Sequence, residues 1–441
     1  ALALPPAVAA HQLSRSFESR LPLAVYLVGA AGAVALSFAF VLVRDLRADP
    51  VADRGRRVTV PAPVRGLLRV VGLIGWVWIM AQGLIGGESD AEVSRLFTWV
   101  YGWVGVALIS AFVFPIWTWL DPFSTLHDIG AWIGRRAGAG GVSPAAYPAA
   151  LGRWPAVIGF GAVVWLELVA YGAGSRTLAL LIAGYSVYTL AMMAQYGRAT
   201  WSRNGEIFSV WFALLGRLAP LTTLTDDRGG VMRRRDFAAG LREGGWATSD
   251  IVLVGLATSS ILFDGLSQTE IWAKTFGLPA ALPQTLLLAA FLGIIVGAAL
   301  VVARLVGVSS TGAGLLPIAV GYLLAHYFTY LLTDGQRIVI AISDPLQQGK
   351  NYFGTAFMEP SSGWLSPALV WTLQLVAVVG GHMIGAWAGH VVAAGAIVAE
   401  GGEAGGGMSV RRRQIPLAVV MVALTTLTLW SLGQALFIPT N

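Results

Sequence analysis

The chain has 441 residues, of which 56% are hydrophobic and only 12% carry a charged side chain. An ordinary soluble domain has about 25% charged residues, so this composition and a mean hydropathy of +0.70 predict a polytopic helical membrane protein. The net charge of +6 does not indicate a nucleic-acid partner, because the basic residues lie in short loops between apolar runs. The absence of cysteine excludes disulfides, thiolate metal sites and cysteine nucleophiles.

The N-terminal residues 1–21, which open with ALALPPAVAA, contain no signal-peptide h-region of their own. We expect an extracytoplasmic tail there, either a mature N-terminus left by signal-peptide cleavage or a plain disordered segment. Ten apolar runs follow, and each predicts a transmembrane helix within one all-α bundle that covers residues 22–437. The predicted spans are 22–43, 65–86, 97–120, 154–174, 177–196, 247–266, 284–306, 314–334, 365–392 and 415–437.

The orientation of the bundle follows from the distribution of Lys and Arg on alternate sides of the ten spans. If the N-terminus lies outside, 22 of the 29 basic residues fall on the inner side. Inner loops of membrane proteins carry such an excess. This distribution predicts that both termini are extracytoplasmic.

Two inner loops have the pattern of additional helices. Residues 121–136 carry apolar side chains at helical spacing, and residues 198–221 form a longer apolar segment. We expect interfacial amphipathic helices, with 198–221 either lying on the membrane surface or entering it as a half-helix. Segments 226–245 and 400–407 are rich in Gly and Arg or in Gly alone, and we expect mobile cytoplasmic loops there.

Two carboxylic acids stand inside predicted spans. Glu167 lies within the fourth span and Asp264 near the outer end of the sixth. A carboxylate within a membrane is costly unless it is protonated, paired or hydrated, and such residues often mark ligand or proton pathways. The alternatives are a neutral glutamic acid that bonds a neighbouring helix, and an Asp264 that only ends its helix in headgroup water.

His326 lies near the middle of the eighth span. Tyr322, His326 and Tyr330 follow helical spacing together with Thr329 and Thr333, so all five share one face. Lipid cannot satisfy a polar stripe, which must therefore face protein or water. A neutral imidazole there could bind a metal or relay a proton, and it could equally be a satisfied core residue.

The ninth span contains His382 and His390, eight residues apart. His390 is expected at the solvated inner interface, whereas His382 lies deeper and is a further candidate for the polar site. The same span repeats a small residue at every fourth position: Ala377, Gly381, Gly385 and Gly389. This pattern predicts close packing against another helix.

The sequence assigns no catalytic residue and no cofactor. It contains no HExxH, P-loop or GxSxG motif. If a metal is bound, His326 and Glu167 are the ligand candidates. The lipid bilayer is the expected partner, and a small-molecule or ion ligand and further membrane subunits both remain open.

Five collinear segments carry a resemblance to a known family: GRATWSRNGEIFSVWFALLGRLAPL, ILFDGLSQT, AHYFTYLLTDGQ, SDPLQQGKNYFGTA and GGHMIGAWAGH. Over residues 22–437 the chain resembles bacterial polytopic membrane proteins labelled hypothetical or fenitrothion hydrolase-like. The resemblance implies a bacterial cytoplasmic (inner) membrane location and, from the label, hydrolysis of a phosphotriester. It supplies no catalytic motif that can be transferred to this chain.

Three functions are therefore weighed. The first is a transporter or permease in which Glu167, Asp264 and His326 line a polar cavity and exchange protons with a bound solute. The second is a membrane-embedded hydrolase in which His326 and a carboxylate activate water on a hydrophobic, organophosphate-like ester. The third is a non-catalytic membrane subunit or assembly factor whose buried polar groups hold helices together. We favour the transporter.

Overall fold

The computed structural model describes residues 22–43, 56–88, 92–138, 143–223, 229–277, 280–399 and 408–434. Two long helices of the first half of the chain are α3 (Ala62–Ile85) and α9 (Ser175–Tyr196). The long helices of the bundle are α2 (Leu23–Val43), α8 (Trp154–Leu168), α12 (Thr248–Ser267), α14 (Ala281–Val306), α15 (Val308–Asp334), α17 (Pro367–Ala399) and α18 (Met408–Leu432).

Shorter elements connect the long helices. They are α4 (Val93–Arg95), the π-helix η1 (Leu96–Gly105), α5 (Val106–Phe112), α6 (Trp117–Leu120), α7 (Pro122–Arg136), η2 (Ala149–Leu151), α10 (Arg198–Asn204), α11 (Ile207–Leu215), η3 (Ala239–Arg242), α13 (Glu270–Phe276) and α16 (Arg337–Ser343). The strands are β1 (Arg57–Thr59), β2 (Leu221–Thr223) and β3 (Val231–Arg234).

The predicted all-α bundle is confirmed. Nine helical stretches within the described ranges are long and apolar enough to cross a membrane. They correspond to nine of the ten predicted spans. The remaining predicted span, 22–43, corresponds to α2. This helix is apolar over Leu23–Ala39, the stretch whose side chains are described. Large apolar side chains face outward on helices such as α3 and α14, as they do where lipid is the solvent.

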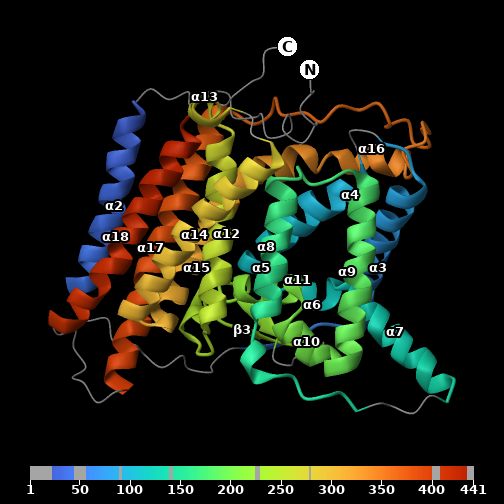
Figure 1. The fold of residues 1–441 in the computed structure, drawn as a ribbon, viewed down its shortest axis with the longest axis horizontal. Coiled ribbons are helices and arrows are strands. Elements are labelled where there is room, and N and C mark those ends of the chain that lie inside the picture. Colours follow the sequence, from blue (N-terminus) through green and yellow to red (C-terminus); the bar gives the residue numbers. More distant parts are fainter. Residues whose placement is uncertain are drawn as a thin grey trace.

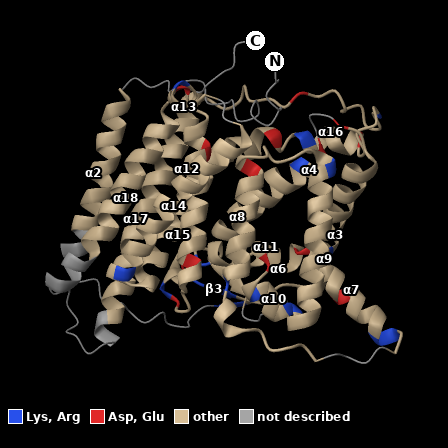
Figure 2. Cartoon of the chain, viewed as in Figure 1, with Lys and Arg blue, Asp and Glu red and all other residues tan. Residues whose placement is uncertain are grey.

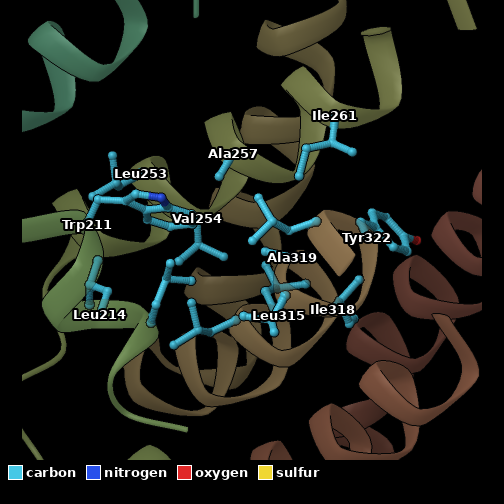
Figure 3. Packing of buried hydrophobic residues seen from close by; sticks show 14 of the residues in the cluster. Trp211, Leu214, Leu253, Val254, Ala257, Ile261, Leu315, Ile318, Ala319 and Tyr322 are labelled. Atoms are coloured by element: carbon cyan, nitrogen blue, oxygen red, sulfur yellow. The ribbon is translucent and has the colours of Figure 1, made fainter. Parts of the chain in front are cut away.

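The centre of the bundle is formed by α12 and α15, which are buried over most of their length. Figure 1 shows them between a group formed by α2, α14, α17 and α18 and a group formed by α3, α7 and α9. Figure 3 shows the packing at this centre, where Trp211 of α11 lies beside Val254 of α12, and Leu315 of α15 belongs to the same buried cluster. The two central helices contact α14, α17 and α18 on one side and α8, η1 and α11 on the other, so polar residues on them are shielded from lipid.

The predicted small-residue face of α17 is confirmed as a contact with α15. A Cβ atom added at Gly385 would lie 2.3 Å from the carbonyl oxygen of Gly314, and one at Gly381 would lie 2.6 Å from that of Pro317. Gly321 of α15 faces Ala377 in the same way, at 2.5 Å. The two backbones approach so closely that only glycine fits at these positions.

The structure corrects the prediction of one continuous helix over 97–120. The helix that begins at Val93 ends at Phe112, and α6 starts only at Trp117 after a turn that contains Pro115. The residue before a proline avoids helical geometry, which explains the break. The span itself is largely a ten-residue π-helix, η1, which directs Trp99 and Trp103 into the core.

Residues 198–221 form a broken helix that enters the bundle. Helix α10 ends at Asn204, and α11 starts at Ile207 with Glu206 as its N-cap. Residues of α11 are buried against α5 and α8, so this segment does not lie on the surface. Residues 121–136 form α7, whose Ile129, Trp132 and Ile133 are exposed.

A small antiparallel sheet replaces part of the loop that was expected to be mobile. The strand order is β1-β3-β2, with Val58 opposite Met232 and Thr222 opposite Arg233. Segment 226–245 is thus partly structured, although 226–228 and the whole of 400–407 lie outside the described residues. Figure 2 shows Lys and Arg gathered around β3, α10 and α7, and we call this side of the bundle the arginine end.

Candidate functional site

Four side chains from three helices form a hydrogen-bonded cluster. His326 Nε2 on α15 lies 2.8 Å from Asp264 Oδ2 on α12. The neighbouring Tyr327 hydroxyl lies 3.1 Å from the same Asp264 oxygen and 3.2 Å from Glu167 Oε1 on α8. Gln268 donates to the other Asp264 oxygen at 2.7 Å. The structure therefore brings Glu167, Asp264 and His326 together, and Tyr327 joins them.

The number of protons in this cluster is limited by Tyr327. A phenol has one O–H donor, so it can donate to only one of the two carboxyl groups that it contacts. The second contact is a hydrogen bond only when the other carboxyl is protonated and donates to the phenol oxygen. When one carboxyl group is protonated and the other ionised, the geometry fits two states, in which either Glu167 or Asp264 holds the proton.

The cluster lies toward the end of the bundle opposite the arginine end. Helices α8, α12 and α15 run in parallel, and Arg153 before α8 pairs with Asp250 at the start of α12. Glu167 is one residue from the end of α8, and His326 is about 12 Å from the end of α15 at 1.5 Å per residue. The side chains of His326 and Asp264 are 13% and 11% exposed, so water can reach the pair.

A fifth polar group lies beside the cluster. The hydroxyl oxygen of Ser431 on α18 is buried and has no hydrogen-bond partner within the described residues. Ser431 and His326 both approach the backbone of Gly265, where a Cβ atom would lie 3.1 Å from the serine oxygen and 3.7 Å from His326 Nδ1. An unsatisfied buried hydroxyl next to a hydrogen-bonded cluster is suited to binding a ligand or a water molecule.

The other predicted site residues lie outside this cluster. Tyr322 turns toward α17, where its hydroxyl lies 3.4 Å from His382 Nε2, and His382 Nδ1 bonds the carbonyl of Val378 at 2.8 Å. Tyr330 packs against the small apolar group around Val100 and Ala341. The polar stripe predicted on α15 is thus divided among different neighbours.

His390 was expected at a solvated interface, and this prediction is wrong. The side chain is buried, and its Nδ1 lies 3.0 Å from Gln414 Oε1 on α18. Helix α17 extends to Ala399, beyond the predicted end at residue 392. The longer helix places His390 within the bundle.

A second buried carboxylate lies on the arginine side, between α10 and α11. Glu206 accepts hydrogen bonds from the Tyr185 hydroxyl at 2.8 Å, the Trp117 indole at 3.2 Å and the backbone N–H groups of Phe208 and Ser209. Burial, followed by the nearby Asp121, raises the pKa of Glu206. Glu206 caps α11 by accepting the two backbone N–H groups, and the Tyr185 and Trp117 donors hold its carboxylate at the break between the two half-helices.

Aromatic rings separate the two polar regions. Trp103 lies beside Glu167 and packs on Phe160 with ring centroids 5.1 Å apart. Phe160 in turn meets Trp211 at 5.3 Å. On the arginine side, Trp117 packs against Phe208 and Phe212, each at 5.4 Å. We call these six rings the aromatic layer.

Glu167 and His326, the ligand candidates if a metal is bound, are linked through Tyr327 and Asp264. In the parts of the chain that the structure describes, no group of three or more His, Asp and Glu side chains has an arrangement that could hold a metal ion.

Sequence reasoning missed Tyr327, Ser431 and Trp103. Tyr327 follows His326 directly and lies off the stripe that was chosen by helical spacing. The only signal for it was a phenol at mid-membrane depth beside a histidine. Ser431 lies in an apolar run with several hydroxyl residues and has no distinguishing pattern.

Comparison with known proteins finds no match among family models, curated proteins or solved structures. The class of the protein therefore rests on its own helices. Their length, apolar outer surfaces and buried polar interior define a multi-pass α-helical membrane protein that contacts the lipid bilayer.

Proposed function

We propose that the protein is a proton-coupled membrane transporter, with the cluster of Glu167, Asp264, His326 and Tyr327 as its proton-binding site. The observation that carries this proposal is the single Tyr327 hydroxyl between two carboxyl groups. The protonated carboxyl group gives its proton to the Tyr327 oxygen while the phenol gives its own proton to the other carboxylate, and this double transfer interchanges the two states of the network. The proton can thereby pass from one carboxyl group to the other without leaving the protein.

Charge balance links this relay to a solute. Buried groups in a membrane favour a neutral assembly. Two carboxylates and a neutral imidazole together carry two negative charges. The cluster is therefore neutral when it has taken up two protons. Loss of one proton leaves one negative charge, and binding of a cationic group restores neutrality. The cluster is thus suited to the exchange of a proton for a cationic solute or ion.

Helix breaks support the same proposal. Transporters bind their solutes where membrane helices are interrupted. Helix α8 ends at Leu168, one residue after Glu167, and is followed by Tyr171 and Ala173 with positive φ angles. The break between α10 and α11 is the corresponding feature on the arginine side.

The test uses the full-length protein in liposomes loaded with a pH-sensitive dye. Proton movement is recorded as sodium, potassium, ammonium, small organic ammonium ions, amino acids or carboxylates are added outside. For any solute that moves protons, Tyr327→Phe is expected to reduce the rate by at least about tenfold. This variant keeps the ring but removes the only hydroxyl between the carboxyl groups, and loss of a hydrogen bond to a charged group is worth about a factor of ten or more.

Glu270→Gln is the matched control, because Glu270 lies on the exposed helix α13 and pairs with the exposed Lys274. Its rate should equal that of the unmodified protein. An unchanged rate in Tyr327→Phe liposomes would refute the relay. If no solute in the panel moved protons through the unmodified, folded protein, the assignment as a non-catalytic subunit would be favoured.

We also infer that the protein resides in a bacterial cytoplasmic membrane with the arginine end in the cytoplasm. The distribution of basic residues supports this orientation. A reporter that is active only in the cytoplasm is expected to be silent when it is fused to the C-terminus and active when it is inserted within residues 139–142. The opposite pattern would reverse the orientation.

A second proposal, a membrane hydrolase, is favoured by one observation. Asp264 holds His326 at 2.8 Å, and the unpartnered Ser431 hydroxyl lies on the same side of Gly265 as His326 Nδ1. A carboxylate that orients a histidine beside a hydroxyl is a known general-base arrangement. The resemblance to fenitrothion hydrolase-like proteins supports it too. Release of nitrophenol from an aryl ester or phosphotriester by purified protein, abolished by both His326→Ala and Ser431→Ala, would favour this proposal over transport.

A further inference from the structure

A cavity of about 380 Å³ lies at the arginine end, on the far side of the aromatic layer from the proton-binding cluster. Its wall is formed by residues from α6, α7, α10, α11, β2 and the segment that follows β3. Small-molecule pockets have volumes of about 300–1,000 Å³, so a compact ligand fits. The ionisable residues of the wall are five arginines and two acids: Arg153, Arg198, Arg203, Arg217, Arg235, Asp121 and Glu243.

The carboxylates of the two acids of the wall already accept hydrogen bonds from other groups of the protein. Asp121 accepts the backbone N–H groups of Phe123 and Ser124 at the start of α7. Glu243 Oε1 accepts from Arg233 at 2.7 Å and from Arg235 at 2.9 Å. Two further arginines of the wall pair with carboxylates outside it, Arg153 with Asp250 at 2.7 Å and Arg198 with Asp128 at 3.1 Å. The guanidinium of Arg217 has no such ion pair among the described residues.

Arg217 is a cation of the wall that the nearby Asp250 and Glu243 attract without direct contact. It donates to the backbone carbonyls of Glu243 and Gly244 and stacks on the Trp246 ring, and it makes no ion pair with a carboxylate of the described residues. Burial lowers its pKa, which shows that the charge lies where water solvates it poorly. An anion in the cavity would offset that cost.

Hydroxyl groups supply further donors around the same cavity. Six Ser and Thr residues contribute to the wall: Thr118, Ser124, Ser202, Ser209, Thr222 and Thr223. The buried Ser202 hydroxyl has no hydrogen-bond partner among the residues that the structure describes. Guanidinium and hydroxyl groups together are the donors that bind phosphate oxygens, and the planar guanidinium matches them two at a time.

We propose that this cavity binds a phosphate group, carried either by a soluble phosphate compound or by the headgroup of an anionic phospholipid. The site is separate from the proton-binding cluster, since none of the four cluster residues lines it. An occupant would contact α10, α11 and the segment after β3 at once. It would therefore connect the two half-helices to the small sheet.

The test uses the full-length protein in a neutral detergent and follows its thermal unfolding. Sodium phosphate and sodium diphosphate are compared with sodium chloride at equal ionic strength. Short-chain phosphatidylglycerol is compared with phosphatidylcholine of the same chain length. We expect a saturable rise in unfolding temperature with phosphate, diphosphate or phosphatidylglycerol, because a ligand that binds only the folded state stabilises it.

Two variants and one control locate the site. Arg203→Gln and Arg217→Gln are each expected to weaken binding by about tenfold or more, since each removes a charged donor. Arg135→Gln is the control, because Arg135 is an exposed arginine of the last turn of α7 that does not line the cavity. If Arg217→Gln lowers the unfolding temperature without ligand, the effect of ligand is compared between the Arg203→Gln variant, whose side chain is exposed, and the unmodified protein.

Each outcome decides the proposal. Stabilisation by the phosphate salts identifies a soluble ligand, and stabilisation by phosphatidylglycerol alone identifies a lipid headgroup; both support a phosphate site if the cavity variants weaken it. Equal effects of chloride and phosphate, or equal losses in Arg135→Gln and Arg203→Gln, would show a diffuse charge effect and overturn the proposal. Absence of stabilisation by all probes would also overturn it.

Discussion

Replacing Arg153 with methionine is expected to lower the free energy of unfolding by about 3–5 kcal/mol. Arg153 Nη1 lies 2.7 Å from both oxygens of Asp250, whose side chain is fully buried. Removing the guanidinium leaves a carboxylate in the protein interior without its cation. Asp250 also caps α12 through the backbone N–H of Ala247, so it cannot turn away to solvent.

Reversible unfolding in mixed detergent micelles measures this loss. The double variant Arg153→Met with Asp250→Asn should recover most of it, because the uncharged amide still caps the helix and leaves no buried charge. Lys274→Met breaks an exposed pair on α13 and should change stability by no more than about 0.5 kcal/mol. A loss below about 1 kcal/mol in Arg153→Met would mean that Asp250 is hydrated in the folded protein.

Two alanine substitutions on α17 are expected to have opposite signs. Gly385→Ala places a methyl group 2.3 Å from the Gly314 carbonyl oxygen, so α15 and α17 must separate, at a cost of about 1–3 kcal/mol. Gly380→Ala meets nothing within 4 Å and should stabilise the helix by up to about 1 kcal/mol.

The same unfolding assay compares the two variants directly. Both add one methyl group to the same helix, so the difference between them reports the neighbours of Gly385, which are the Gly314 backbone at 2.3 Å and the flexible Met421 side chain at 3.3 Å. If Gly385→Ala stabilised the protein as much as Gly380→Ala, the close approach of the two helices would be disproved.

Helix positions were predictable because burial in lipid imposes a long apolar run on every span. The small residues of α17 were predictable for a similar reason, since their spacing follows the helical repeat. The three strands were not, because each has only three or four residues and β1 lies far from its partner β3 in the sequence. Pairing at such separation leaves no local pattern.

The candidate site was partly accessible from the sequence. Glu167, Asp264 and His326 were chosen because ionisable groups are costly in a membrane, and the structure joins them through hydrogen bonds. The residue that connects them, Tyr327, is not ionisable in that sense and was overlooked. The arginine-lined cavity was missed because the basic residues were interpreted only as a topology signal.

The aromatic layer has an electrical consequence. The six rings lie between the two polar regions and are poorly polarisable, so part of the voltage across the membrane falls over them. A unit charge that crosses a full membrane potential exchanges about 2.3 kcal/mol per 100 mV. Any net charge passed from the proton-binding cluster toward the arginine end would therefore be driven or opposed by the cell's own potential, and its movement would register as a current.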